Sequence, residues 1–153
     1  MEAELTLERA NDHRQGHLSD VLGLEFVELS SQIVRSRMTI GQKHRSPTGY
    51  LHAAAIVAMA DTTCGAGTHV NLPKGTNGFT TLELKSNFLA TLREGELFCE
   101  AAPEHIGRSS QVWSAVVSDG NGKKIALFRC SQIILYPDRG TLKVEVQQTE
   151  RRE

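Results

Sequence analysis

GYLHAAAIVAMADTTCGAGTHV, residues 49–70, is the stretch that decides the fold of this chain. Residues 51–60 are apolar almost throughout and rich in alanine, the strongest helix former. A helix that is apolar on every face is normally buried. Gly49 precedes the run, and we expect Gly65 and Gly67 to mark the region where the helix ends. The stretch therefore predicts one long buried helix.

Asp61 follows directly on the apolar run and is the residue that most needs an explanation. A carboxylate on a buried helix is costly unless it is paired or hydrogen-bonded. One interpretation is that Asp61 marks where the helix reaches water, or that it caps a local turn with Thr62 and Thr63. The other is a working carboxylate that faces a cleft, where burial raises its pKa toward that of a useful base.

The overall composition narrows the class of protein. At 153 residues the chain is long enough for one domain with a substantial core. Its net charge of −1 provides no basic field for nucleic acid or an acidic membrane surface. The N-terminus lacks the apolar segment of a secretion signal, and no apolar run is long enough to span a bilayer. We therefore expect a soluble cytoplasmic protein without nucleic-acid or membrane partners.

The cysteines and histidines form no recognisable metal or disulfide pattern. The three cysteines, Cys64, Cys99 and Cys130, are odd in number and lack a CxxC spacing. The six histidines are scattered and form no HxH or HExxH pair. The motifs of dinucleotide binding, nucleotide hydrolysis and the usual serine hydrolases are also missing from the sequence. We therefore expect no metal and no redox cofactor.

The chain before the central helix divides into an arm, a helical turn and strands. Residues 2–14 are mostly polar and fit a short surface helix or a loose arm. Residues 17–24 look like one helical turn that Gly23 ends. Residues 25–40 alternate in two pieces, which predicts two short strands or one bent strand. The polar loop 41–49 then leads into the helix.

Strand patterns dominate the chain after the helix. Pro103 lies inside one of them, which implies an edge position or a bulge. The sequence DGNG at 119–122 is a strong hairpin signal. We expect an antiparallel meander, followed by a charged tail over residues 138–153. The four expected strands cover residues 79–90, 97–106, 111–118 and 124–136.

The first of these four strands has a clear alternation of two faces. One face carries Leu82, Leu84, Ser86 and Phe88, and the other carries Thr81, Glu83, Lys85 and Asn87.

The order of elements is strand, one long helix, then four strands, which is an α+β arrangement. One small sheet cannot cover such a helix on all sides, and a single sheet also leaves its edges unprotected. A dimer would remove both problems, so we expect a homodimer or a homotetramer.

The sequence resembles a known family in the helix and in the strands that follow it. Residues 49–63 are similar to the G-x-x-H-G-G-x-x-x-x-L-A-[DE] signature of hotdog acyl-CoA thioesterases, most closely the PaaI-like and 4-hydroxybenzoyl-CoA thioesterase branch. Residues 79–97 and 107–126 resemble the family's strand-turn-strand and closing hairpin. The resemblance implies a hotdog fold, with one long central helix wrapped by an antiparallel sheet. It implies a single domain over residues 1–137 with a short N-terminal arm, 1–16.

The resemblance also implies an active site. The family uses a carboxylate at the position of Asp61 and backbone N–H groups at the helix N-terminus, here Ala53 and Ala54, as the oxyanion site. The physical basis is independent of the family, since a helix N-terminus presents free N–H groups and about half a positive charge. Such donors polarise a thioester carbonyl while the carboxylate activates a water or attacks directly.

The spacing of these groups favours a site shared between two subunits. Asp61 lies nine residues after His52, roughly half a turn out of phase and about 13 Å along the helix axis. One helix therefore cannot easily aim both groups at one thioester, whereas two helices side by side can. The family places its sites across the dimer interface, which implies two equivalent sites per dimer.

Several positions depart from the family pattern. Ala53 and Ala54 replace two glycines, and their methyl groups narrow the approach to the oxyanion site. Ser46 stands where the family often has an Asn or Gln that orients the water or the carbonyl. The serine side chain is shorter, so it could act only through a water. Gly65 stands where the aryl-CoA branch has threonine, which leaves Thr62 or Thr63 as a candidate substitute.

His52 has two interpretations that the sequence leaves open. In one, it orders the loop or hydrogen-bonds the thioester carbonyl. In the other, it is simply a satisfied histidine at the start of a helix.

The family binds CoA at the turn between the two central strands of the meander, here Gly107, Arg108, Ser109 and Ser110. Arginine and turn N–H groups both suit a phosphate, although an ordinary polar hairpin fits the same residues. We expect the central helix and nearby strands, with Asn87 and Phe88, to line the acyl pocket.

The sequence thus favours an acyl-CoA thioesterase that releases free acid and CoA. A non-catalytic acyl-CoA binding module of the same fold is the first alternative, favoured by the departures at Ser46, Ala53 and Ala54. A hotdog hydratase or dehydratase is the second, but its pairing of a histidine with an acidic residue is not seen here.

Overall fold

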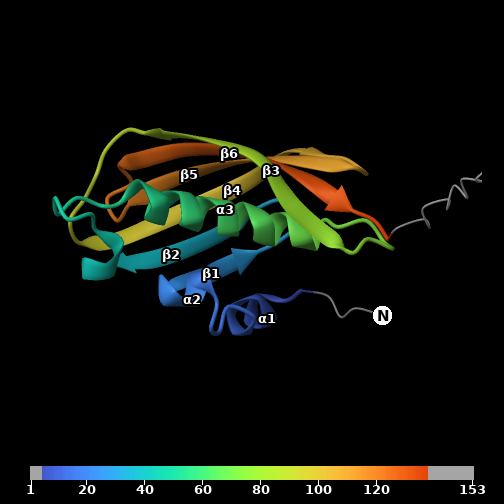
Figure 1. Cartoon of the computed structure of the whole chain (residues 1–153), viewed down its shortest axis with the longest axis horizontal. Coiled ribbons are helices and arrows are strands. Elements are labelled where there is room, and N and C mark those ends of the chain that lie inside the picture. Colours follow the sequence, from blue (N-terminus) through green and yellow to red (C-terminus); the bar gives the residue numbers. More distant parts are fainter. Residues whose placement is uncertain (1–4, 138–153) are drawn as a thin grey trace, which may run out of the picture.

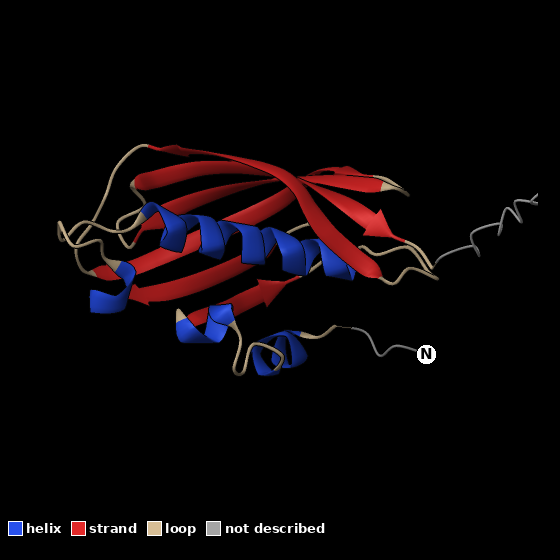
Figure 2. Cartoon of the chain, in the orientation of Figure 1, coloured by secondary structure: helices blue, strands red, loops and turns tan. Residues whose placement is uncertain are grey.

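A computed structural model describes residues 5–137 of the protein. One long helix, α3 (Ala53–Val70), lies across one face of a six-stranded antiparallel sheet (Figure 1). Colouring by secondary structure shows two layers, with the sheet curved around the helix (Figure 2). This is the predicted α+β hotdog architecture. The expected charged tail, 138–153, lies outside the described residues.

The remaining elements follow the predicted order. The chain before α3 contains two short helices and two strands, as expected, and four strands follow α3. Gly23 ends the second helix in a left-handed conformation with φ 72°. The elements are α1 (Leu7–Asp12), α2 (Leu18–Val21), β1 (Leu24–Leu29), β2 (Val34–Ile40), the 3-10 helix η1 (Gln42–His44), β3 (Gly78–Phe88), β4 (Gly95–Ile106), β5 (Ser110–Asp119) and β6 (Lys124–Leu135).

The order of strands in the sheet corrects the predicted meander. The order is β1-β2-β4-β5-β6-β3, so only β4, β5 and β6 form a meander. α3 packs on β2, β4, β5 and β6, and it carries the chain across the sheet before β3 begins. β3 therefore joins the far edge beside β6, and β4 returns to the centre beside β2. As a result, β3 is an edge strand with one side unpaired.

The two glycines expected at the helix end lie inside the helix instead. α3 continues through Gly65 and Gly67 to Val70. A Cβ atom on Gly67 would lie 2.3 Å from the Trp113 ring, so this glycine permits a close approach between helix and sheet. Asn71 is the C-cap that follows the helix, and its carbonyl accepts a hydrogen bond of 3.0 Å from Gln111 Nε2.

The bulge predicted at Pro103 is confirmed. The pairing between β4 and β5 shifts register between Pro103 and His105. The pairing of β4 with β2 ends at Ala101, so the missing N–H of Pro103 leaves no gap in that ladder. The hairpin predicted at 119–122 is also present, and Asp119 Oδ1 accepts hydrogen bonds from the backbone N–H groups of Asn121 and Lys123.

The core fills the space between α3 and the sheet. Its largest fully buried apolar side chains are Trp113, Leu24, Met38, Met59, Leu97 and Ile125. His44 is buried with both ring nitrogens used, because Nδ1 accepts from the Gly41 N–H at 2.9 Å and Nε2 lies 2.7 Å from the Leu22 carbonyl oxygen. Cys64, Cys99 and Cys130 are buried free thiols. Burial raises the pKa of Cys99 to about 12.

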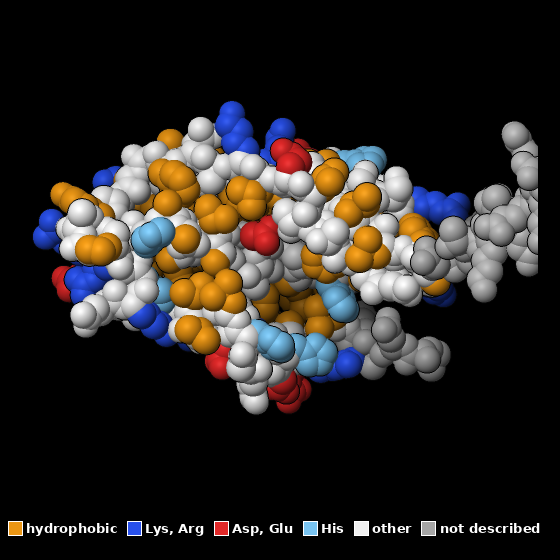
Figure 3. Space-filling view, in the orientation of Figure 1, with side chains coloured by type: hydrophobic (Ala, Val, Ile, Leu, Met, Phe, Trp, Pro, Cys, Tyr) orange, Lys and Arg blue, Asp and Glu red, His pale blue; other side chains and the backbone are white. Residues whose placement is uncertain are grey.

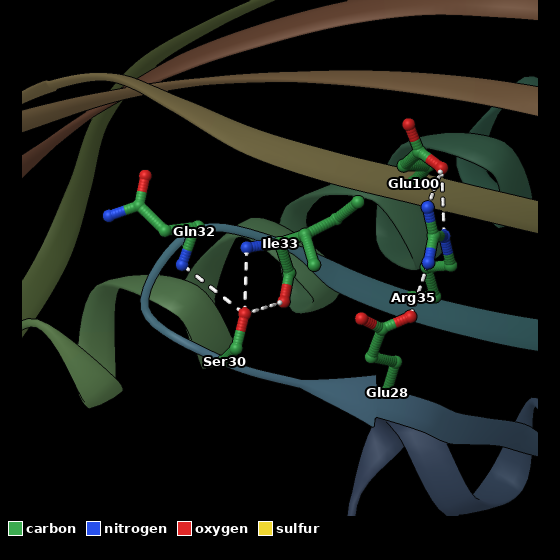
Figure 4. Close-up of polar contacts among 6 residues, drawn as sticks. All are labelled: Glu28, Ser30, Gln32, Ile33, Arg35 and Glu100. Atoms are coloured by element: carbon green, nitrogen blue, oxygen red, sulfur yellow. Dashed lines mark hydrogen bonds and ion pairs between the residues drawn. The ribbon is translucent and has the colours of Figure 1, made fainter.

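The opposite face of the sheet carries ion pairs that tie neighbouring strands together. Arg35 on β2 lies between Glu28 on β1 and Glu100 on β4, with 2.8 Å from Arg35 Nη2 to Glu100 Oε2 (Figure 4). Ser30 Oγ closes the adjacent turn by accepting from the N–H of Ile33 at 3.0 Å. Exposed pairs of this kind contribute about 0–1 kcal/mol each. The ion pairs on this face therefore stabilise the fold less than the apolar core between α3 and the sheet.

Within residues 5–137, no helix combines the length and the apolar character that crossing a membrane requires.

Candidate active site

Asp61 lies in the middle of α3 and is half-buried. The helix continues for nine residues beyond it, so the interpretation of Asp61 as the cap of a local turn is wrong. Thr63 turns instead toward the sheet, where its hydroxyl lies 2.7 Å from Ser36 Oγ. Thr62 lies beside Asp61 on the wall of a common cavity. Asp61 is therefore a carboxylate held within a buried helix and open to a cavity.

A threonine on the edge strand holds the Asp61 carboxylate. Thr81 Oγ1 donates to Asp61 Oδ1 at 3.1 Å and also lies 3.1 Å from Gln132 Oε1 on β6. Gln132 is fully buried, and its Nε2 donates to Cys130 Sγ at 3.3 Å. This chain of contacts fixes the position of the carboxylate relative to the sheet.

The sequence alternation placed Thr81 on the wrong face. Register shifts between Thr81 and Glu83, so Leu82 is an extra residue and the alternation restarts after it. Thr81 pairs with buried Gln132, whereas Glu83 pairs with Ser131 on the other face. A bulge on an edge strand carries no reliable sequence signal here, which is why this partner of Asp61 was missed.

The surroundings of Asp61 move its pKa in opposite directions. Burial raises the pKa of the carboxyl above its ordinary value of 3.8, and the hydrogen bond from Thr81 partly lowers it. A carboxylate with a raised pKa accepts a proton more readily than a solvent-exposed one. The site therefore has the chemistry of a general base or a carboxylate nucleophile.

A cavity of about 320 Å³ opens beside Asp61. Figure 3 looks onto the face that carries α3 and shows this hollow, with apolar side chains in its depth and histidines at its rim. Its lining comes from α3, from β1 and β3, and from the segment around α1: Leu5, Ala10, His13, Phe26, Asp61, Thr62, Gly65, Ala66, His69, Phe79 and Thr81.

The N-terminus of α3 forms a second group of candidate residues. His52 is the N-cap, and its Nδ1 accepts from the Ala54 N–H at 3.0 Å. The ring proton of neutral His52 must then lie on Nε2, which makes that nitrogen a donor. This cap engages the Ala54 N–H. The Ala53 N–H is the backbone donor at this helix end that has no acceptor within residues 5–137. His52, Ala53 and Ala54 are all exposed.

Ser46 belongs to the loop that leads into this helix end. Its hydroxyl lies 2.6 Å from Thr48 Oγ1 and 3.3 Å from the Tyr50 carbonyl oxygen. Its role in this structure is to close the turn from Ser46 to Gly49, whose N–H donates to the Ser46 carbonyl at 2.9 Å.

Within one chain, the structure does not bring the two groups together. Asp61 and Thr62 meet at the cavity, whereas Ser46, His52, Ala53 and Ala54 gather at the helix N-terminus. The nine residues between His52 and Asp61 separate them by about 13 Å along the axis.

The expected CoA-binding residues lie at the turn between β4 and β5. Arg108 and Ser109 line a separate cavity of about 340 Å³ with Tyr136. The Arg108 guanidinium lies 5.9 Å from the centre of the Tyr136 ring, and Tyr136 Oη donates to the Arg108 carbonyl at 2.7 Å. Gly107 is required by space, because a Cβ there would lie 2.8 Å from the Ser110 carbonyl oxygen.

Asn87 and Phe88 lie on opposite faces of β3. Phe88 pairs with buried Ala126 and so faces the helix side, where it is 47% exposed. Asn87 pairs with exposed Leu127 and lines a groove with Lys85 and Arg129. The structure therefore places Asn87 away from Asp61.

Among the described residues, no group of three or more His, Cys, Asp or Glu side chains is arranged to hold a metal ion.

The profile of the Thioesterase superfamily matches residues 48–126, which include α3 and the strands that follow it. The chain belongs to the thioesterase superfamily. Membership makes it a thioester hydrolase with the hotdog fold that the structure displays.

Three relatives match this chain over nearly their whole length. The proofreading thioesterase EntH of Cronobacter turicensis is 27% identical over 131 residues, 86% of this chain and 95% of EntH. The 1,4-dihydroxy-2-naphthoyl-CoA hydrolase of Escherichia coli is 26% identical over 132 residues, 86% of this chain and 96% of that enzyme. The ComA2 protein of Bacillus subtilis, named as an esterase, is 31% identical over 118 residues, 77% of this chain and 94% of ComA2.

A solved thioesterase structure has the same fold. A mutant form of thioesterase PA1618 from Pseudomonas aeruginosa superposes with a TM-score of 0.82 at 24% identity, covering 88% of this chain and 96% of that one.

Proposed function

We propose that this thioester hydrolase acts on acyl-CoA and releases the free acid and CoA, with Asp61 as the reacting carboxylate. The observation that carries the proposal is the half-buried Asp61, held by Thr81 on the wall of an apolar cavity. Burial in this position raises the pKa of Asp61, so the carboxylate accepts a proton more readily than a solvent-exposed one.

The helix N-terminus supplies the complementary charge. The thioester oxygen gains negative charge as its carbonyl carbon is attacked, and the Ala53 N–H and the Nε2–H of His52 are the donors we assign to it. Such preorganised donors contribute roughly 3–4 kcal/mol each to lowering a barrier. Asp61 takes a proton from water, the resulting hydroxide attacks the carbonyl carbon, and the C–S bond breaks. The CoA sulfur then takes up the proton.

Direct attack by Asp61 is the other route, and it passes through a mixed anhydride. A single turnover in ¹⁸O-labelled water tests for the anhydride, because direct attack by water never places label in Asp61, whereas hydrolysis of the anhydride at its Asp61 carbonyl does. Label in the Asp61 carboxylate, detected by peptide mass spectrometry, would establish the anhydride.

The two groups of residues come together in our proposal through a homodimer. β3 has an unpaired edge eleven residues long, and Leu84 and Phe88 on its helix side are 41% and 47% exposed. Pairing two such edges would protect them and lay two α3 helices side by side. Each site would then use Asp61 and Thr62 of one subunit with His52, Ala53 and Ser46 of the other. A tetramer of such dimers satisfies the same arrangement.

CoA binding is assigned to the turn after β4. Arg108 presents its guanidinium beside Tyr136, and Gly107 and Ser109 contribute backbone and hydroxyl groups suited to a phosphate. The relatives support a CoA thioester, because one is named as a CoA hydrolase and another as a proofreading thioesterase.

A non-catalytic acyl-CoA binding module is the second candidate. The observation in its favour is that His52 engages the Ala54 N–H, which leaves fewer backbone donors for an oxyanion. The deciding experiment measures thiol release from aryl and aliphatic acyl-CoAs with the wild type and Asp61→Ala. We expect turnover by the wild type alone. Binding without thiol release would favour the module, and equal rates would remove Asp61 from the mechanism.

A further inference from the structure

Gln132 on β6 is a fully buried amide that contacts the threonine holding Asp61. Its Oε1 lies 3.1 Å from Thr81 Oγ1, the same distance that separates Thr81 Oγ1 from Asp61 Oδ1. The other end of the amide is also engaged, because Nε2 donates to Cys130 Sγ at 3.3 Å. Cys130 forms a further hydrogen bond with Cys64 on α3. Gln132 therefore presents an oxygen, and not an N–H group, to Thr81.

Thr81 has one hydroxyl proton for two acceptors. The ionised Asp61 carboxylate and the Gln132 carbonyl can only accept, so the hydroxyl donates to one of them at a time. The carboxylate is the stronger acceptor because it is charged, and it takes the Thr81 proton. The buried Gln132 oxygen then has no other donor within residues 5–137. Leaving a buried carbonyl without a donor is costly.

Protonation of Asp61 removes this conflict. If Oδ1 carries the proton, it donates to Thr81 Oγ1, and if Oδ2 carries it, Oδ1 becomes a weaker acceptor. In both cases the Thr81 hydroxyl can turn to Gln132 Oε1. The first case gives an unbroken chain of donors from Asp61 through Thr81 to Gln132, and hydrogen bonds in such a chain strengthen one another. The neutral form of Asp61 is therefore paired more completely than the ionised form.

We propose that Gln132 is a positioning residue that draws the Thr81 hydroxyl away from Asp61 and so favours the uptake of a proton by Asp61. The inference rests on the proposed role of Asp61 as the base. When water gives a proton to Asp61 and the hydroxide attacks, the Thr81 hydroxyl turns from Asp61 to Gln132. Gln132 does not line the cavity, so it acts through Thr81 and not on the substrate.

Other titratable groups face Asp61 from the helix, the sheet and the N-terminal segment. They are Cys64 and His69 on α3, His13 at the end of α1, Cys130 on β6 and Glu83 on β3. Glu83 accepts a hydrogen bond from Ser131 on the other face of the sheet. The test therefore has to follow Asp61 through its own carboxyl carbon, which separates its titration from that of the imidazoles and thiols.

The test measures the titration of Asp61 in the full-length protein by ¹³C NMR, with Asp61→Asn identifying the signal. Gln132→Met removes the competing oxygen and keeps an unbranched side chain of similar size. We expect this variant to lower the pKa of Asp61 by about half a pH unit to one pH unit, the effect of one neutral hydrogen bond. Thr81→Val should raise it. In the double variant Gln132→Met should have no further effect, because Gln132 acts through Thr81.

Gln111→Met is the matched control. Gln111 pairs with Gln132 across β5 and β6 and is equally buried, but its hydrogen bonds go to Trp113 and to the Asn71 carbonyl. We expect this variant to lower Tm and to leave the titration of Asp61 unchanged. In Gln132→Met the acidic limb of kcat/KM should move to lower pH together with the NMR titration.

The wild type itself provides a second measurement, which does not require Gln132→Met to fold. The Gln132 Cδ resonance should shift at the pH at which Asp61 titrates, and this shift should be absent in Thr81→Val. Three results would overturn the inference: an Asp61 pKa that is unchanged or higher in Gln132→Met, an equal change in Gln111→Met, or a Cδ shift that persists in Thr81→Val. If no acyl-CoA is hydrolysed, the thioesterase proposal fails, and the two NMR titrations still decide whether Gln132 controls proton uptake by Asp61.

Discussion

Burial and the Thr81 hydroxyl act on the Asp61 carboxylate in opposite directions. Replacing Asp61 with Asn keeps an oxygen that accepts from Thr81 but removes the base. We expect Asp61→Asn to lower kcat by about 10²- to 10⁴-fold, the usual contribution of a positioned base. Thiol release under saturating acyl-CoA measures the loss, and a rate close to wild type would show that Asp61 is not the reacting group.

The same substitution should stabilise the fold at neutral pH. The pKa of Asp61 is raised in the folded protein, so the folded state holds more protons than the unfolded state between the ordinary pKa of 3.8 and the raised value. The contribution of Asp61 to the free energy of unfolding therefore falls as pH rises through that window, and it stays lower above it. We expect Asp61→Asn to have a higher Tm than wild type at pH 7 and no advantage below about pH 3.8. Calorimetry across pH tests this, and a lower Tm at pH 7 would contradict it.

Thr81 should set the acidic limb of the pH–rate profile. Removing its hydrogen bond with Thr81→Val takes away the contact that lowers the pKa of Asp61. We expect the acidic limb of kcat/KM to move to higher pH, because protonated Asp61 is inactive as a base. Thr81→Ser keeps the hydroxyl and should retain the wild-type profile. A profile unchanged in Thr81→Val would show that the contact is structural only.

At the residue scale, the sequence was sufficient to identify Asp61 as a candidate site residue but not to identify the residues that contact it. A carboxylate directly after an apolar run can be recognised from the sequence alone, because burying a charged group is costly and therefore unusual. Thr81 is twenty residues away and faces Asp61 only because of the bulge at Leu82. The contribution of His52 Nδ1 to the helix cap also depends on side-chain geometry that a sequence does not contain.

Helix α3 and the sheet meet most closely at Gly67. Alanine normally favours a helix over glycine by about 1 kcal/mol, but a Cβ at Gly67 would lie 2.3 Å from Trp113. We expect Gly67→Ala to lower the free energy of unfolding by about 1–3 kcal/mol through overpacking. Gly65→Ala is the control, since its Cβ meets Phe79 at an ordinary 3.4 Å. Urea denaturation should show Gly65→Ala as neutral or stabilising, and equal losses in both variants would argue against the steric cause.

At the element scale, periodicity predicted whether a segment is a helix or a strand better than it predicted which strands lie side by side in the sheet. Alternation identified the strands, and the apolar run identified α3, because both patterns report burial directly. The length of α3 was underestimated because Gly67 resembles a terminator, although packing against Trp113 requires it. The position of β3 beside β6 depends on where α3 delivers the chain, which local pattern does not encode.

At the scale of the whole molecule, the proposed shared site makes a prediction about mixed dimers. Asp61→Ala and His52→Ala each damage both sites of their own homodimer. Mixing them by co-expression restores one intact site in each heterodimer, because the Asp61 of one subunit meets the helix N-terminus of the other. We expect roughly a quarter of wild-type activity from a statistical mixture. Light scattering should show a dimer or a multiple of it, and an absence of complementation would place each site within one chain.

The close packing of Trp113 on Gly67 also gives the protein an internal optical reporter. Trp113 is the single tryptophan of the chain, fully buried, with its Nε1–H donating to Gln111 Oε1 at 3.0 Å. Gln111 in turn donates to the carbonyl of Asn71 at the C-terminal end of α3. The indole therefore senses whether that end of the helix rests on the sheet, and not what occupies the exposed N-terminal end. Its emission should be blue-shifted in the native protein and move to longer wavelength only when helix and sheet separate. Folding can thus be followed by fluorescence while turnover is followed independently at the other end of the same helix.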